Sequence, residues 1–496
     1  MHRLTTVFTL TAAAFAQQPQ RTCESLTALS LPNTTIESAA VQEAAGNVPS
    51  FCRVTAVTTH PPAGDRVKIF VGLPLTGWNG RFQGVGGGGF SGGSANGVTG
   101  PVRQGYAAGS TDTGHEGGSG SFALDSTGHL NWLLIRDNAY LGIHEMTVTA
   151  KALIEAFYGT PARHAYFNGC STGGRQGLSE AQRYPTDYDG ILSGAPAINW
   201  TRLHVEQMWG TVVMLAANNP VPQCKFAAAQ AAAVAACDGN DGVKDGVIEN
   251  PRACTFDPKA LVGTSTSCGD FTEADANVIR KIWEGPRRQD GSFLWYGLQR
   301  GADFTGLSST GGTPLVPRPN PITLEWWRYF LNQNPQWDYL NLTPPSYEQY
   351  WQQSVEEFSA VLATDNPDLA AFRDHGGKLV LWHGWSDQLI YPEGTIDYYQ
   401  RVQKQMGGAD NTANFARLFL APGVGHCGGG PGPTPEGQFD AVVKWVEQGK
   451  APDTLNAVGR ANGATRTRPL CPFPLVAKYT GTGSTDDAAN FTCAAQ

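Results

Sequence analysis

A glycine-rich turn between a predicted strand and a predicted helix constrains the fold of this chain most. Residues 169–173 read Gly-Cys-Ser-Thr-Gly, after a predicted strand at 164–168 and before a helical pattern at 175–183. Hydrolases with a Gly-x-Ser-x-Gly turn expose a nucleophilic serine in this way, because glycine leaves room for the sharp strand-to-helix bend. Ser171 is therefore the candidate nucleophile.

The same pattern occurs again around Ser91, at residues 89–93. With 60 glycines in 496 residues, against an average share of about 7 %, the chain produces such matches by chance. No helical pattern follows Ser91 directly, so we expect Ser91 to lie in a loop.

Short apolar runs alternate with amphipathic helices on both sides of a less regular middle segment. Further strands are predicted at residues 67–71, 378–382 and 417–420, and helices at 135–158, 394–406 and 438–447. This alternation is typical of the α/β class, with a mostly parallel sheet covered on both faces. We expect one catalytic domain formed by residues 17–215 and 366–496, with residues 216–365 inserted as a lid.

The candidate acid and base each follow a later predicted strand. Asp387 comes just after residues 378–382, and His426 comes just after residues 417–420. A serine hydroxyl needs a base to take its proton and a third group to hold that base. In strand–turn–helix hydrolases these partners follow the serine in the order acid, then histidine, and both order and placement fit here.

Three other histidines are alternatives for the base. His383 is the nearest rival, but it lies on the same loop as Asp387 and too close to it. His60 and His115 precede the serine and fit the expected order less well.

Two cysteines flank the candidate residues. Cys170 precedes Ser171 and Cys427 follows His426. A disulfide needs Cα atoms within about 7 Å, so a bridge between these two cysteines would hold nucleophile and base together. The alternative, that each cysteine pairs elsewhere, stays open at this point.

Catalysis by a serine also needs N–H donors for the developing oxyanion. The backbone N–H of Thr172 is the first candidate, because it follows the nucleophile. The glycine run at residues 84–89 is the expected source of the second donor. A phosphate-binding loop is the alternative use of such a run, but no Lys-Ser or Lys-Thr follows it.

The N-terminus predicts export. Residues 1–16 have a basic start, an apolar run and the ending Ala-Phe-Ala, which is the layout of a secretory signal peptide. Ten cysteines, an even number, suit an oxidising extracellular compartment. Four triplets permit N-glycosylation in a eukaryotic host, at Asn33, Asn199, Asn341 and Asn490.

The charge balance excludes two classes of partner. The chain has 35 Lys and Arg against 43 Asp and Glu, a net charge of −8. It therefore lacks the basic surface that nucleic acids or anionic membranes require. No later run of about 18 apolar residues predicts a membrane span.

Three motifs together resemble the tannase and feruloyl esterase family. They are residues 169–174 (Gly-Cys-Ser-Thr-Gly-Gly), 383–387 (His-Gly-Trp-Ser-Asp) and 425–427 (Gly-His-Cys). The likeness extends from about Cys23 to Cys493. It implies an α/β-hydrolase fold with a lid, a disulfide tying the serine to the histidine, and hydrolysis of esters of aromatic acids. It also implies Gly89 as the second oxyanion donor.

The resemblance implies further disulfides. The terminal segment matches the family with a Cys471–Cys493 pair, and Cys237–Cys254 would brace a loop of the lid. Only Cys268 remains where the family often has a second lid disulfide, and Cys224 is left over, so we expect Cys224–Cys268. The last expected pair is Cys23–Cys52.

A calcium site in the lid is also implied by the resemblance. Residues 237–247 match it, and no organic cofactor is expected. The implied ligands are the side chains of Asp238, Asp241 and Asp245 with the backbone carbonyls of Val243 and Val247. Calcium takes six to eight oxygen ligands, and clustered carboxylates repel one another without a cation. Without the resemblance, three Asp-Gly turns are the simpler interpretation.

Two residues differ from a family member that cleaves a terephthalate monoester. Thr172 stands where that protein has Glu, and Ile390 stands where it has an aromatic residue. We therefore expect a feruloyl esterase acting on a small aromatic ester or on feruloylated plant cell-wall polysaccharide. The alternatives are a tannase acting on galloyl esters and, from another class, a non-catalytic binding module. The sequence does not predict the oligomeric state.

Aromatic residues in the lid allow two interpretations, a wall for the acyl group or an ordinary core. They are Trp326, Trp327, Tyr329, Phe330, Trp337 and Tyr339.

Overall fold

The computed structural model describes residues 18–461 and 463–495. The expected signal peptide, residues 1–16, lies outside the described residues. Among those residues, no helix is both long and apolar enough to cross a membrane.

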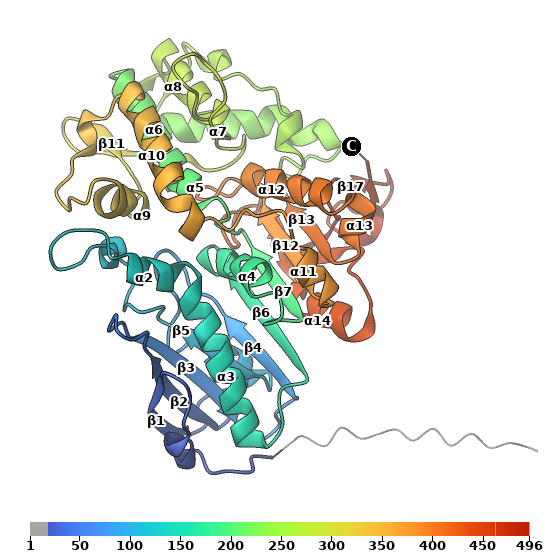
Figure 1. Cartoon of the computed structure of the whole chain (residues 1–496). Coiled ribbons are helices and arrows are strands. Elements are labelled where there is room, and N and C mark those ends of the chain that lie inside the picture. The colour runs from blue at the N-terminus through green and yellow to red at the C-terminus, as the bar shows by residue number, and fades with distance from the viewer. Residues whose placement is uncertain (1–17, 462, 496) are drawn as a thin grey trace, which may run out of the picture.

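A nine-stranded mixed sheet forms the centre of the molecule, with the strand order β1-β2-β3-β5-β4-β6-β7-β12-β13 (Figure 1). The strands are β1 (Thr34–Gln42), β2 (Phe51–Thr58), β3 (Val67–Pro74), β4 (Arg81–Val85), β5 (Ala107–Thr111), β6 (His164–Cys170), β7 (Gly190–Gly194), β12 (Lys378–Gly384) and β13 (Ala416–Ala421). All neighbours from β5 to β13 are parallel, whereas the pairs β1/β2, β2/β3 and β3/β5 are antiparallel. Short connections join β1 to β2 and β2 to β3, and such connections permit only antiparallel pairing.

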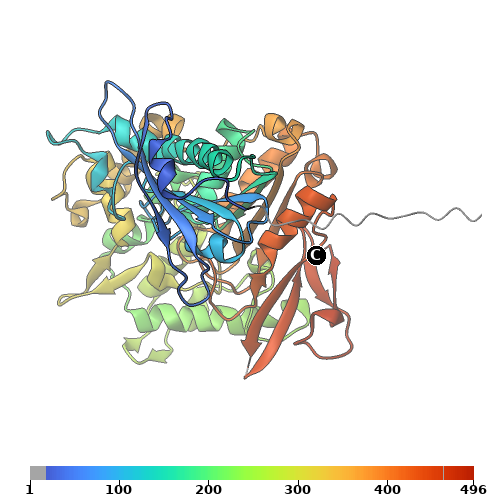
Figure 2. The same ribbon diagram turned by 90° about the horizontal axis from the view of Figure 1, so that it is seen from below.

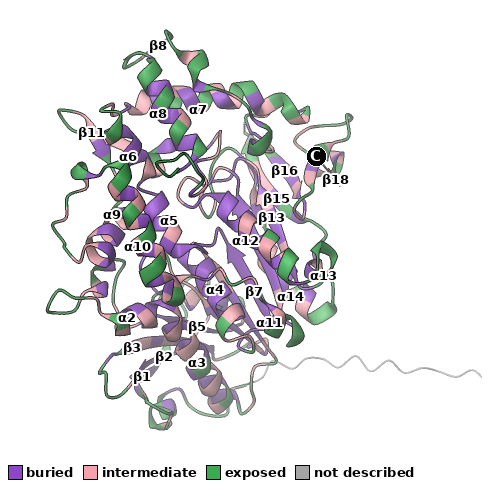
Figure 3. Cartoon of the chain, turned by 45° about the horizontal axis from the view of Figure 1, so that its top comes forward, coloured by how far each residue is buried: buried purple, intermediate pink, exposed green. Residues whose placement is uncertain are grey.

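Helices cover both faces of this sheet, as expected for the α/β class. One face carries α3 (Gly142–Tyr158), α4 (Thr172–Arg183) and α12 (Pro392–Gln405), and the other carries α14 (Gln438–Gln448). Alternate residues of β12 enter the two cores: Leu379 packs on the first side and Val380 on the second. The strands are buried under both layers (Figure 3).

The helix expected at residues 135–158 is interrupted near its start. It consists of α2 (Trp132–Arg136), a π-helical turn (Asp137–Leu141) and α3. Such turns insert a residue into a helix and redirect nearby side chains. Periodicity alone predicted one continuous helix here.

The lid lies above the carboxyl ends of the parallel strands (Figure 1). It comes between the end of β7 at Gly194 and the start of β12 at Lys378. Its main helices are α5 (Trp200–Glu206), α6 (Trp209–Ala216), α7 (Gln223–Cys237), α8 (Glu273–Glu284), α9 (Pro321–Glu325) and α10 (Pro344–Leu362). The expected lid boundaries at residues 216 and 365 stay a prediction.

The chain ends in short antiparallel strands beside the lid (Figure 2). They are β14 (Thr434–Glu436), β15 (Leu455–Ala461), β16 (Ala464–Leu470), β17 (Val476–Tyr479) and β18 (Phe491–Ala494). Arg468 on β16 reaches Asp245 in the lid, with 2.7 Å between Nη2 and Oδ2. The carboxyl-terminal segment therefore supports the loop for which calcium was expected.

Five disulfides join all ten cysteines, and none of the described cysteines is free. The pairs are those expected from the sequence: Cys23–Cys52, Cys170–Cys427, Cys224–Cys268, Cys237–Cys254 and Cys471–Cys493.

Candidate active site

Ser171 occupies a strained turn between β6 and α4. Its backbone angles are φ 64° and ψ −123°, a conformation that residues other than glycine rarely adopt and that functional sites often retain. A Cβ atom at Gly169 would lie 2.4 Å from the carbonyl carbon of Gly173. Glycine at position 169 is therefore what allows the chain to bend tightly at the serine.

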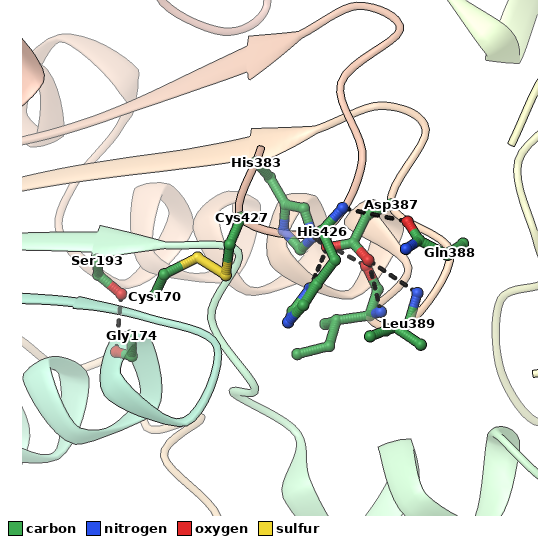
Figure 4. The surroundings of a disulfide bond; sticks show 10 residues. Cys170, Gly174, Ser193, His383, Asp387, Gln388, Leu389, His426 and Cys427 are labelled. Atoms are coloured by element: carbon green, nitrogen blue, oxygen red, sulfur yellow. Dashed lines mark hydrogen bonds and ion pairs between the residues drawn. A yellow bond between two sulfur atoms is a disulfide. The ribbon is translucent and has the colours of Figure 1, made fainter. Parts of the chain in front are cut away.

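Asp387 and His426 lie on adjacent loops, after the neighbouring parallel strands β12 and β13. Nδ1 of His426 donates to Oδ2 of Asp387 at 2.9 Å (Figure 4). Oδ1 of Asp387 accepts the backbone N–H groups of Leu389 and Ile390 at 2.8 and 2.9 Å. Asp387 is fully buried, so its carboxylate is fixed in orientation by these bonds.

His383, the rival base, instead supports the acid. Its Nε2 lies 3.0 Å from Oδ2 of Asp387 and 2.8 Å from the carbonyl oxygen of Ile390. Because that carbonyl can only accept, Nε2 carries the proton, and the hydroxyl of Thr395 donates to Nδ1 at 2.8 Å. His383 is fully buried, and it presents its proton to the carboxylate.

The two histidines decide the charge of the acid. Burial alone would raise the pKa of Asp387, but His426 and His383 outweigh it and hold that pKa well below its usual range. Asp387 therefore stays ionised at any pH where a serine hydrolase works, as a residue that orients a histidine and stabilises its charged form must.

The disulfide Cys170–Cys427 joins the serine turn to the histidine loop (Figure 4). Its Cα atoms are 6.0 Å apart although 257 positions separate the two residues. Ser171 and His426, the neighbours of these cysteines, line the same pocket. The bridge therefore holds both reacting side chains at one site.

The glycine loop after β4 approaches the start of α4. The hydroxyl of Thr172 donates to the carbonyl of Gly89 at 2.5 Å, and the backbone N–H of Gly173 donates to the carbonyl of Gly87 at 3.0 Å. Within the described chain, the backbone N–H groups of Thr172 and Gly89 donate to no protein acceptor. Both are therefore free to bind an oxyanion.

Three side chains hold this loop in a role that the sequence did not predict, and His115, considered there as an alternative base, is one of them. Gln176 accepts the N–H of Gly87 at 2.9 Å and donates to the carbonyl of Gly92 at 3.1 Å. Asn138 and His115 both bind the carbonyl of Phe90, at 3.0 and 2.9 Å. No local pattern marks these residues, because their partners lie far away in the sequence.

Ser91 lies in this same loop, as expected. Its hydroxyl donates to the carbonyl of Gly93 at 3.1 Å.

Gln388 supports the candidate base, because its side-chain oxygen accepts the backbone N–H of His426 at 3.1 Å.

A pocket of about 420 Å³ contains Ser171 and His426, a size typical of small-molecule sites. Its apolar wall consists of Ala197, Trp200, Leu203, Ile322, Leu389 and Ile390. Ile390, noted in the sequence for its position after the acid, therefore contacts the pocket. A larger cavity of about 520 Å³ lies beside the C-terminal strands and contains none of the three candidate catalytic residues.

The six lid aromatics singled out in the sequence belong to a core rather than to this wall. Trp326, Trp327 and Phe330 are at most 1 % exposed and pack on α5 and α10. Among the described residues that line the pocket, Trp200 is the only tryptophan.

The loop expected to bind calcium has a suitable donor set. Oδ1 of Asp238 accepts the N–H groups of Asp245 and Gly246 at 3.0 and 3.1 Å, and Oδ1 of Asp241 accepts that of Val243 at 2.9 Å. Burial, together with the charges of Asp245 and Asp238, raises the pKa of Asp241. These repelling carboxylates suit a divalent cation.

The three carboxylates of this loop nevertheless do not converge on one position. The carboxylates of Asp238, Asp241 and Asp245 are not gathered within 4.8 Å of one another, unlike two other groups of the described residues. Oδ2 of Asp245 is bound by Arg468. Binding calcium through all three side chains would draw this loop together.

Comparison with known proteins adds to this geometry. A family model described as tannase and feruloyl esterase matches residues 52–494. The chain belongs to this family. It is a carboxylic ester hydrolase, as the family and the names of its relatives show.

One relative is named probable feruloyl esterase, from Arthroderma benhamiae. It is 41 % identical over an alignment of 481 residues that covers 94 % of this chain and 87 % of the relative. This coverage means that the similarity includes both the sheet and the lid.

Two solved structures superpose on nearly the whole chain. Feruloyl esterase B from Aspergillus oryzae has a TM-score of 0.83 and 26 % identity, covering 95 % of this chain and 99 % of the other. Tannin acyl hydrolase from Aspergillus niger has a TM-score of 0.85 and 26 % identity, covering 94 % and 92 %. The expected α/β fold is confirmed.

Proposed function

We propose that this member of the family is a secreted feruloyl esterase, with Ser171 as nucleophile, His426 as base and Asp387 as orienting acid. The observation that carries the proposal is the shared pocket. An apolar cavity of about 420 Å³ has both Ser171 and His426 in its wall. Such a cavity accepts the flat, apolar ring of an aromatic acyl group.

In the acylation step, Nε2 of His426 takes the proton of the Ser171 hydroxyl as Oγ attacks the ester carbonyl carbon. The carbonyl oxygen becomes an oxyanion, which the N–H groups of Thr172 and Gly89 stabilise. When the tetrahedral intermediate collapses, the ester C–O bond breaks and His426 returns the proton to the leaving alcohol.

In the deacylation step, a water molecule replaces the alcohol. His426 takes a proton from this water as its oxygen attacks the acyl-enzyme carbonyl. Collapse releases the aromatic acid and returns the proton to Oγ of Ser171. Asp387 stays ionised throughout and stabilises the imidazolium that forms in each step.

Tannase activity on galloyl esters is the second candidate, because the tannin acyl hydrolase from Aspergillus niger has the same overall fold. Hydrolysis of methyl ferulate and of methyl gallate, with Ser171→Ala as control, separates the two. A higher kcat/KM on the ferulate supports the proposal. A higher value on the gallate assigns the chain to the tannases.

Secretion is supported by the five disulfides, which are characteristic of oxidising compartments. The glycosylation triplets differ in access. Asn33 and Asn341 are exposed, whereas Asn199 is only 5 % exposed and lies in the core. Asn199 is therefore not an acceptor in the folded chain, and we propose glycans at Asn33 and Asn341 in a eukaryotic host.

We also propose that the loop at residues 237–247 binds a structural calcium ion. Asp238, Asp241 and Asp245 would supply carboxylate oxygens, and Val243 and Val247 would supply backbone carbonyls. The ion would neutralise three carboxylates of one short loop and would stabilise the lid. The catalytic steps do not involve it.

A further inference from the structure

A second group of polar side chains joins the connection between β2 and β3, which holds His60 and Asp65, to the junction of α2 and α3, which holds Asp137. Nδ1 of His60 contacts Oδ2 of Asp65, and the backbone N–H of His60 donates to Oδ1 of Asp65 at 2.8 Å. Nε2 of His60 lies 3.5 Å from Oε1 of Glu145. The imidazole is therefore held between two carboxylates.

Asp137, the first residue of the π-helical turn, adds a separate observation. It is fully buried, and neither of its carboxylate oxygens has a hydrogen-bond partner among the described residues. Its carboxylate comes within 4.8 Å of the ligand atoms of His60 and Asp65. A buried carboxylate without a partner is strongly unfavourable, so this one requires a positively charged or proton-donating ligand.

We propose that His60, Asp65 and Asp137 form a binding site for a divalent transition-metal ion. One imidazole nitrogen and two carboxylate oxygens form a donor set that suits Zn²⁺ or Mn²⁺. Between the two carboxylates the imidazole starts doubly protonated, with Nδ1–H toward Asp65 and Nε2–H toward Glu145. When the metal binds Nδ1, the Nδ1 proton leaves to solvent. Nε2 keeps its proton toward Glu145, which orients the ring as outer carboxylates do at histidine–metal sites.

The group is accessible from one side. The side chains of His60 and Glu145 are 21 % and 25 % exposed, whereas that of Asp65 is fully buried. An ion can therefore enter past the histidine and bind the buried carboxylates.

This site is connected to the oxyanion loop through the π-helical turn. Asn138, next to Asp137, donates from Nδ2 to the carbonyl of Phe90 and to Oγ1 of Thr113, each at 3.0 Å. Phe90 follows Gly89, the expected oxyanion donor. A metal ion on Asp137 would therefore fix the turn that holds this loop, as a positioning device outside the reaction.

A shared proton is the competing explanation. Burial and the neighbouring Asp65 raise the pKa of Asp137 to about 7, so a protonated Asp137 could donate to Asp65 with no metal present. In that case the pair would need only a proton, and no metal would bind.

Metal content distinguishes the two explanations. The mature enzyme and Asp137→Asn are stripped with a chelator, dialysed with excess Ca²⁺ to fill the proposed lid site, and titrated with Zn²⁺. Bound zinc per chain is measured by inductively coupled plasma mass spectrometry. Asp241→Asn, in the lid loop, is the matched control. We expect one more equivalent of zinc in the wild type and in Asp241→Asn than in Asp137→Asn.

A second readout uses Co²⁺ in place of Zn²⁺, because a nitrogen ligand alters its visible absorption. We expect His60→Gln to lose the cobalt spectrum, and this variant replaces Asp137→Asn if the latter fails to fold. Zinc should raise the Tm of the wild type and not that of either variant. Equal zinc content in all proteins, with no change in Tm, would overturn the proposal and favour the shared proton.

Discussion

His383 and His426 share one oxygen atom of Asp387. Nε2 of His383 lies 3.0 Å from Oδ2, and Nδ1 of His426 lies 2.9 Å from the same atom. The acid therefore serves two imidazoles, of which only His426 lines the pocket with Ser171. His383 is a positioning residue, because it acts on the reaction through Asp387.

Replacing His383 tests this role. We expect His383→Leu to lower kcat by about 10- to 100-fold, the loss that follows removal of a hydrogen-bond partner of a metal ligand. KM should change little, because His383 does not line the pocket. Steady-state ester hydrolysis separates the two constants. His375→Leu, at an exposed histidine, should leave both unchanged, and an unchanged kcat in His383→Leu would contradict the role.

The disulfide beside the active site should affect activity as well as stability. We expect Cys170→Ala/Cys427→Ala to lose about 2–5 kcal/mol of unfolding free energy and at least about 10-fold in kcat/KM, because a small misplacement of reacting groups is costly. Denaturant unfolding and ester hydrolysis measure the two effects. Cys471→Ala/Cys493→Ala is the control, with a stability loss only. Equal activity losses in both would show that the bridge does not position the site.

The glycine loop offers a matched pair of substitutions. Gly89 has φ +60°, and a Cβ there would lie 3.3 Å from Cδ1 of Ile322, whereas a Cβ at Gly88 meets nothing within 4 Å. We expect Gly89→Ala to lower kcat by about 10²-fold, by displacing an oxyanion donor, and Gly88→Ala to have little effect. Steady-state kinetics on methyl ferulate compares them. Similar kcat values for Gly89→Ala and Gly88→Ala would show that Gly89 is not an oxyanion donor.

A buried glutamate in the lid should make stability depend on pH. Glu206 is 2 % exposed, and burial raises its pKa well above the usual value. The pKa of Glu206 is thus higher in the folded chain than in the unfolded chain. At a pH between these two values the folded chain keeps a proton that the unfolded chain releases, so the free energy of unfolding falls as pH rises. Glu206→Gln removes this loss, which reaches about 1.4 kcal/mol per pH unit.

We therefore expect the Tm of Glu206→Gln to rise relative to the wild type between pH 5 and pH 8. Thermal unfolding in matched buffers measures the difference. A difference that does not change with pH would mean that Glu206 is ionised in the folded protein.

Chelation tests the calcium proposal. Calcium binds only the folded loop, so its removal should lower Tm by several degrees, with recovery on adding Ca²⁺. Asp241→Asn should be insensitive to both treatments. An unchanged wild-type Tm, with no calcium in the purified protein, would show that the lid loop does not bind calcium.

The strand pattern predicted the positions of Ser171, Asp387 and His426, because parallel strands end at the same edge of the sheet. It could not predict the role of His383, which depends on how its ring is rotated between Thr395 and Ile390. Nor could it predict the antiparallel strands at the first edge, because the apolar run at β3 suits either direction.

Contacts over long sequence distances explain what else was missed. Asn138 holds Phe90 from a π-helical turn, which the apolar spacing of the predicted helix did not reveal. The lid aromatics could equally have formed a pocket wall or a core, since both need the same residues. Only the packing of Trp326 between α5 and α10 decides for the core.

Labelling with a fluorophosphonate tests the central claim most directly, because this reagent bonds only to an activated serine. We predict one label per chain, located on Ser171 by peptide mass spectrometry. The fraction of ester hydrolysis lost should equal the fraction of chains labelled. Ser171→Ala should remain unlabelled and inactive. A label on another serine, or full hydrolysis by Ser171→Ala, would contradict the account.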